Sequence, residues 1–140
     1  MKANEINVGH IYYVDYEPTR KGEFGKLHMC VVIKKNNDMI TFVTVPLTSQ
    51  EDAPYNNKLS LGIIKSLPDN LKEKESYAVL DQVRTLNSSR FRKLKQNESI
   101  IDAYLTLEQL NNLLQAIIED FLSDIPDEIR KNIGNTLLKN

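Results

Sequence analysis

A strand–turn–strand pattern over residues 28–46 constrains the fold of this chain most strongly. Residues 28–35, HMCVVIKK, have a continuous apolar centre, which predicts a strand buried on both faces. Asn36-Asn37-Asp38 is a tight-turn signal, and residues 39–46, MITFVTVP, then resume the strand pattern. The two segments and the turn between them predict a β-hairpin.

Residues 10–16 and 76–86 mix aromatic, β-branched and polar residues in the way that is typical of strands, and residues 57–61 are a further candidate for a short strand. Residues 17–27 hold one Pro, two Gly and five charged residues, which predicts an exposed loop. Residues 62–75 predict a surface loop with one helical turn.

The predicted helices follow the strands. Thr106-Leu-Glu-Gln109 matches a capping box, and Pro126 is suited to start a second helix. Ser88 or Ser89 is expected to cap a short helical turn over residues 90–94. The apolar stripe of an amphipathic helix falls at positions 107, 110, 114, 117 and 121. Strands followed by helices favour an α+β domain or a small barrel with helices at one side, and argue against a doubly wound parallel sheet.

Composition narrows the range of functions that this chain can have. The 140 residues suit one domain, and one Cys with two His supply too few ligands for a typical structural zinc site, so no metal or cofactor is expected. The sequence holds no run of about 18 apolar residues, so no membrane span is predicted. The N-terminus also lacks the apolar core of a signal peptide. These features predict a soluble, cytoplasmic protein.

Charge is segregated although the net charge is only −1. Residues 84–95 carry five basic side chains and no acid, whereas residues 96–129 carry eight acids and no base. A basic cluster is a hint of a polyanion partner, and the alternative is an ordinary solvated surface. A further hypothesis is that the acidic helices pack against the basic groove of the same chain.

Most catalytic signatures are absent, including glycine-rich phosphate loops and the HExxH and GxSxG motifs. Cys30 lies in an apolar run and is interpreted as a buried structural residue. The remaining candidates are polar residues at strand ends: His28, Thr48, Asp81, Gln82 and Arg84. Each also has a structural explanation, such as a turn hydrogen bond from Thr48 or an ion pair between Asp81 and Arg84.

Four blocks along the chain carry a resemblance to a known family. They are Gly9-His-Ile-Tyr-Tyr-Val-Asp-Tyr-Glu-Pro-Thr19, Lys21-Gly-Glu-Phe-Gly25 with Val31-Val-Ile33, Val45-Pro-Leu-Thr-Ser49, and Val79-Leu-Asp-Gln-Val-Arg-Thr85. In their residue types and order, the chain resembles the MazF/PemK family of toxin endoribonucleases.

The resemblance implies a small SH3-like β-barrel with C-terminal helices, usually a homodimer. It implies one domain over residues 1–140, with a core at 9–122 and an additional helical segment at 123–140. Family members cut single-stranded RNA at short sequences without a metal and are inhibited by a cognate antitoxin. Neither a membrane nor DNA is expected as a partner.

The same resemblance assigns residues to roles. His28-Met29 stands where the family usually has Arg-Pro, and that Arg is thought to act with the Thr that matches Thr48. The resemblance therefore implies that His28 and Thr48 are catalytic. The expected RNA contacts are Arg20, Lys21, Lys26, Ser49, Asp81, Gln82 and Arg84.

Histidine at position 28 changes the expected chemistry. With an unperturbed pKa of about 6.5, histidine can accept or donate a proton near neutral pH, which arginine cannot. It is a weaker permanent cation, so Arg20, Lys26 or Arg84 would have to stabilise the phosphorane. The alternative is a catalytically degenerate module that binds RNA or an antitoxin-like peptide without efficient cleavage.

Overall fold

The computed structural model describes residues 1–16, 27–50 and 57–138. Its strands are β1 (His10–Asp15), β2 (Leu27–Lys35), β3 (Thr41–Thr48), β4 (Lys58–Ile63), β5 (Glu75–Val79), β6 (Arg84–Asn87), β7 (Phe91–Arg92), β8 (Leu94–Gln96), β9 (Ser99–Ile101) and β10 (Ala103–Tyr104). The helices are α1 (Leu107–Leu122) and α2 (Asp127–Leu138), and short 3-10 turns are η1 (Ala3–Glu5), η2 (Leu80–Gln82) and η3 (Ser88–Arg90). The predicted order of strands before helices is confirmed.

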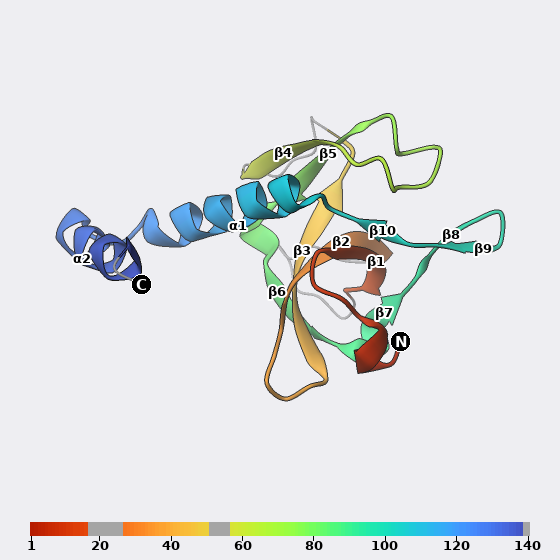
Figure 1. Ribbon diagram of the computed structural model, residues 1–140, viewed down its shortest axis with the longest axis horizontal. Coiled ribbons are helices and arrows are strands. Elements are labelled where there is room, and N and C mark those ends of the chain that lie inside the picture. Colours follow the sequence, from red (N-terminus) through yellow and green to blue (C-terminus); the bar gives the residue numbers. More distant parts are fainter. Residues whose placement is uncertain (17–26, 51–56, 139–140) are drawn as a thin grey trace.

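The main sheet is antiparallel, with the order β10-β1-β2-β3-β5-β4 (Figure 1). In addition, β6 pairs with β3 and β7 pairs with β1. The α+β class is confirmed. Among the described residues, however, hydrogen bonds do not close the expected barrel, because β6 and β7 are joined through the turn η3 and do not pair with each other.

The hairpin predicted over residues 28–46 is formed by β2 and β3, which pair from Cys30 opposite Pro46 to Lys35 opposite Phe42. The loop is stabilised by Asp38, whose Oδ1 accepts the backbone N–H groups of Ile40 at 3.0 Å and Thr41 at 2.9 Å. This is the local hydrogen bonding that makes Asp a turn residue.

Both faces of the central strands are buried, as the continuous apolar run of β2 predicts. Because side chains alternate along a strand, successive residues enter two different clusters. The first cluster includes Ile11, Val31, Val45 and Leu113 of α1. The second cluster includes Tyr12, Val14, Tyr16, Cys30, Val32, Phe42, Leu86 and Phe91.

The single strand predicted over residues 76–86 is wrong, because η2 divides it into β5 and β6. Leu80, the first residue of η2, is buried, and its backbone N–H donates to the Asn57 carbonyl at 2.9 Å. The predicted loop at 62–75 does contain a helical turn, but Ile64 and Leu67 within it belong to the first cluster.

The helical turn expected over residues 90–94 is also wrong in position. The turn is η3, capped by Asn87, whose side-chain oxygen accepts the Ser89 N–H at 2.9 Å. Phe91 and Leu94 are buried in the strands that follow. These strands and the two after them span only two or three residues each, which is too short for a sequence period to identify.

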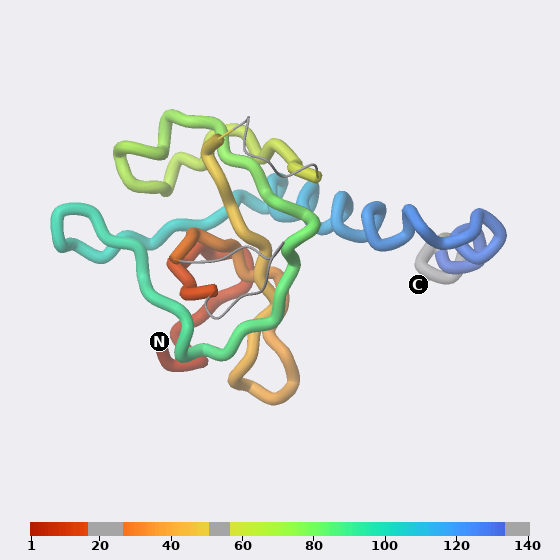
Figure 2. The backbone as a smooth tube through the Cα atoms, turned by 180° about the vertical axis from the view of Figure 1, so that it is seen from behind, coloured from red at the N-terminus to blue at the C-terminus, as the bar shows by residue number. Residues whose placement is uncertain are grey.

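Helix α1 begins with the predicted capping box, in which Thr106 Oγ1 accepts the Gln109 N–H and the Gln109 side chain accepts the Thr106 N–H. The predicted stripe is only partly correct. Leu113 and Ile117 are buried, but Leu107 is 84% exposed and Phe121 60% exposed. The helix contacts β4 and η2 and then extends away from the sheet (Figures 1 and 2).

The second helix predicted after Pro126 is confirmed as α2, whose first turn includes Ile129 and Arg130 N–H groups bonded to the Pro126 carbonyl. It lies at the outer end of α1, far from β7 and β8 in both views (Figures 1 and 2). The hypothesis that the acidic helices pack on the basic stretch of their own chain is therefore wrong for this structure. Of the helices described, none is long and apolar enough to cross a membrane.

Candidate functional site

Three of the predicted site residues lie on one face of neighbouring strands. The β2–β3 ladder ends where Cys30 lies opposite Pro46, and His28 and Thr48 are each two residues further along their strands. Residues two apart share a face, so both side chains belong to the face of Cys30. Arg84 joins the same face from β6, where it lies opposite Thr44 of β3.

The ring of Tyr16 lies between two of these side chains. Its centroid is 6.4 Å from that of His28 and 5.6 Å from Cζ of Arg84. Arg84 Nη1 also donates to the Tyr16 carbonyl at 3.1 Å. A guanidinium over an aromatic face gains a cation–π attraction, so Tyr16 holds Arg84 in a defined position. Arg84 consequently forms no ion pair with Asp81, the structural alternative considered from the sequence.

Tyr16 is itself fully buried, and its hydroxyl lies 3.5 Å from Oγ1 of the buried Thr44. The Thr44 hydroxyl donates to the Arg84 carbonyl at 2.9 Å. Burial raises the pKa of the Tyr16 phenol, so this ring stays neutral and serves as a scaffold. Sequence analysis missed this role, although the alternation Tyr12, Val14, Tyr16 is the pattern of a buried strand face.

Thr48 is half-buried, and its Oγ1 accepts the Gln50 N–H at 3.2 Å. The predicted turn hydrogen bond at this strand end is therefore present. It uses a lone pair of the hydroxyl oxygen, and among the described residues the hydroxyl hydrogen has no acceptor. Thr48 can thus donate to a phosphate oxygen while its own orientation is held by the turn. Ser49 follows it in a bend and is also half-buried.

Asp81 and Gln82 lie in η2, between the segments that pair with Thr44 and Leu47 of β3. Asp81 is exposed and Gln82 is half-buried, and both lie in the turn between β5 and β6, the two strands that pair with β3. The predicted contacts Arg20, Lys21 and Lys26 lie outside the described residues. Within the described part of the chain, no three His, Cys, Asp or Glu side chains are grouped as metal ligands.

Cys30 lies behind the site and is fully buried, as its apolar run predicts. Burial raises the pKa of its thiol, so the reactive thiolate is disfavoured in the folded protein. An unfolded cysteine titrates near pH 8.5. The folded state keeps the proton that the unfolded state loses, so stability is unaffected below about pH 8.5 and falls above it.

We therefore expect native Cys30 to resist a thiol reagent until urea unfolds the chain. Between pH 8.5 and 9.5, its ionisation lowers the free energy of unfolding by up to about 1.4 kcal/mol per pH unit. Urea titrations from pH 7 to 9.5 measure this loss, and Cys30→Ala is the control that removes the ionisable group. An equal loss in both proteins would contradict the assignment.

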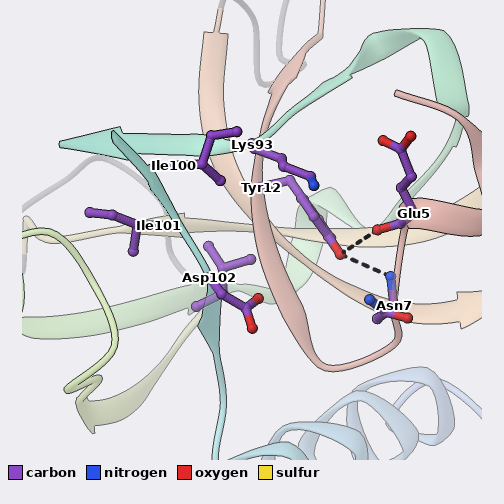
Figure 3. Close-up of a pocket in the computed structure, with 8 residues that line it drawn as sticks. Glu5, Asn7, Tyr12, Lys93, Ile100, Ile101 and Asp102 are labelled. Carbon is purple, nitrogen blue, oxygen red and sulfur yellow. Dashed lines mark hydrogen bonds between the residues drawn. The ribbon is translucent and has the colours of Figure 1, made fainter. Parts of the chain in front are cut away.

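A further pocket of about 240 Å³ lies between the N-terminal segment and β9 (Figure 3). The Tyr12 hydroxyl accepts the Asn7 N–H at 2.9 Å and donates to the Glu5 carbonyl at 3.4 Å. Asp102 at its edge is paired with His10, with Nδ1 and Oδ1 3.0 Å apart. The Tyr12 hydroxyl and the Asp102 carboxylate are thus already bonded within the chain, and Lys93 also lines this pocket.

Comparison with known proteins identifies the family and the fold. The family model of PemK-like, MazF-like toxins of type II toxin–antitoxin systems matches residues 7–121. The fold is similar to the crystal structure of MazF (Form-I) from Deinococcus radiodurans, with a TM-score of 0.56 and 17% sequence identity. The alignment covers 84% of this chain and 96% of that one. No curated protein matches the sequence. Because the family model matches most of this chain, the chain belongs to the PemK/MazF family of type II toxins, whose members are generally endoribonucleases.

Proposed function

We propose that this protein is a metal-independent, sequence-selective endoribonuclease, the toxin of a cytoplasmic toxin–antitoxin pair. The observation that carries the proposal is that His28, Thr48 and Arg84 share one strand face, on which the ring of Tyr16 lies beside His28 and Arg84. A proton carrier, a hydroxyl donor and a fixed cation are the groups that RNA cleavage without a metal requires.

In the proposed reaction, the ribose 2′-oxygen attacks the adjacent phosphorus, and the bond from phosphorus to the 5′-oxygen breaks. The 2′-hydroxyl proton leaves to a base, and the departing 5′-oxygen gains a proton from an acid. His28 carries one of these two transfers. Thr48 donates a hydrogen bond to a phosphate oxygen, and Arg84 stabilises the charge that develops on the phosphorane. The products are a 2′,3′-cyclic phosphate and a 5′-hydroxyl.

The proposed partners follow from the family. Single-stranded RNA is the substrate, and Asp81 and Gln82 are placed to contact base edges, which an unpaired strand exposes. Ser49, Arg20, Lys21 and Lys26 complete the proposed contacts. A cognate antitoxin inhibits the enzyme, which acts as a homodimer. The second candidate is a module that binds RNA or an antitoxin-like peptide without efficient cleavage, and the change from the family arginine to His28 favours it.

The deciding experiment is incubation of the purified protein with a long mixed-sequence RNA in the presence of EDTA. We expect discrete fragments that end in 2′,3′-cyclic phosphates, because no step needs a metal. Two ligation tests identify the products. The 3′ ends should accept an adaptor only after the cyclic phosphate is removed, and the 5′ ends only after a kinase has phosphorylated them. RNA that stays intact at high protein concentration would refute the nuclease and favour the binding module.

A further inference from the structure

The basic stretch at 84–95 does not act as a single surface in the folded protein. Arg84 lies over Tyr16, and Arg90 Nη1 donates to the Asp15 carbonyl at 3.0 Å. The remaining three cations, Arg92, Lys93 and Lys95, are exposed. Among the described residues, none of these three takes part in a salt bridge or a side-chain hydrogen bond. Their charge is therefore available to a ligand.

These three cations line one pocket together with Tyr13 and Leu27. Its volume is about 400 Å³, within the range of roughly 300–1,000 Å³ that is usual for pockets binding organic groups. Tyr13 lies opposite Arg92 in the β1–β7 pairing, and it is half-buried. Leu27 is 48% exposed, so the pocket has an aromatic and an aliphatic wall below a cationic rim.

The pocket is distinct from the site around Tyr16. Tyr13 and Leu27 occupy the opposite strand face, because they alternate with Val14 and His28 along β1 and β2. Yet Leu27 and His28 are consecutive residues, with Cα atoms about 3.8 Å apart. The two places therefore adjoin at the start of β2, where an RNA strand would pass from one strand face to the other. Asp15, the register partner of Leu27, is not among the described residues that line the pocket.

We propose that this pocket binds one unpaired nucleotide of the RNA outside the cleavage site. The base lies against Tyr13 and Leu27, and the neighbouring phosphates contact Arg92, Lys93 and Lys95. Aromatic side chains with basic neighbours are the arrangement that binds single strands, because any base can stack and each phosphate can pair with a cation. The proposal rests on the proposed function for its choice of RNA.

Binding is measured by fluorescence anisotropy with a short labelled RNA whose 2′-hydroxyls are all methylated, so that no 2′-oxygen can attack. The combined change Arg92→Ala, Lys93→Ala and Lys95→Ala is expected to weaken binding. It should also reduce the slope of log affinity against log salt by about two, since each lost single-strand phosphate contact contributes about 0.7. The matched control is Lys2→Ala, Lys65→Ala and Lys74→Ala, three exposed lysines that do not line the pocket.

Both triple variants lower the net charge from −1 to −4, so a general charge effect alters them equally. Equal losses of affinity and of salt slope in the two variants would overturn the proposal. A retained slope in the pocket variant would do the same.

The aromatic wall is tested with Tyr13→Phe and Tyr13→Leu, whose folding is followed by thermal melting. Leucine keeps an apolar side chain but cannot stack, so Tyr13→Leu is expected to bind about 5- to 100-fold more weakly, while Tyr13→Phe binds like the wild type. Wild-type affinity in Tyr13→Leu would overturn the stacking. Unmethylated RNA is tested in parallel: intact RNA with pocket-dependent binding refutes only the nuclease, and cleavage with pocket-independent binding refutes only this inference.

Discussion

Replacement of His28 by alanine is expected to lower the rate of RNA cleavage by about 10²- to 10⁴-fold, the usual contribution of a positioned acid or base. His28 lies on the ring of Tyr16 and not in the core of the protein, so the folded state should survive the change. Single-turnover cleavage in EDTA measures the effect. The control is His10→Ala, which removes the only other histidine, one that pairs with Asp102 away from the site.

Thr48→Ala tests the second proposed catalytic group. Loss of one hydrogen bond donor to a developing charge is expected to cost about 10²- to 10³-fold in rate. Thr85→Ala is the matched control, because Thr85 is exposed on β6 and alternates away from Arg84. Unchanged cleavage in both His28→Ala and Thr48→Ala would place the active site elsewhere.

The change His28→Arg separates proton transfer from charge stabilisation. It restores the residue that the family usually has, and a guanidinium stays protonated at every accessible pH. If His28 carries a proton, the wild-type rate depends on pH near neutrality and the variant loses that dependence. Identical pH profiles would mean that His28 acts only as a donor or positioning group. Cleavage that appears only in the variant would identify the natural chain as the binding module.

Much of the fold could be predicted because its signals are local. The β2–β3 hairpin has an apolar run and an Asp turn in sequence, and the start of α1 has a capping box. The stripe predicted along α1 is buried only in its middle for a physical reason: an apolar stripe indicates that burial against a partner surface is favourable, not that this chain supplies that surface. Leu107 and Phe121 fit the stripe and remain exposed.

The candidate site was less predictable, because it depends on register. His28, Thr48 and Arg84 come from three strands, and only the pairing of those strands brings them to one face. The sequence identified them as strand-end residues but not their common neighbour, Tyr16. The sequence also does not predict that the five positive charges at 84–95 divide between two faces, because that division depends on η3, which separates β6 from β7.

The largest expected effect on stability is at Phe91, which is 1% exposed in the second cluster. Its ring meets Phe42 edge to face at 5.6 Å between centroids, and Tyr12 at 5.9 Å. Truncation of such a side chain removes buried apolar area and leaves a cavity. We expect Phe91→Ala to lower the free energy of unfolding by about 3–5 kcal/mol and Tm by on the order of 10–20 °C.

Urea and thermal unfolding measure this loss, and Phe121→Ala is the control, because it removes the same atoms from a ring that is 60% exposed. That variant should change stability by less than about 0.5 kcal/mol. Phe91 also lies opposite Val14 in the β1–β7 pairing, in the cluster that buries Tyr16. Loss of its ring should therefore weaken the support of His28 and Arg84 as well, and lower the cleavage rate below Tm. A destabilised variant with an unchanged rate would show that the site does not depend on this cluster for its geometry.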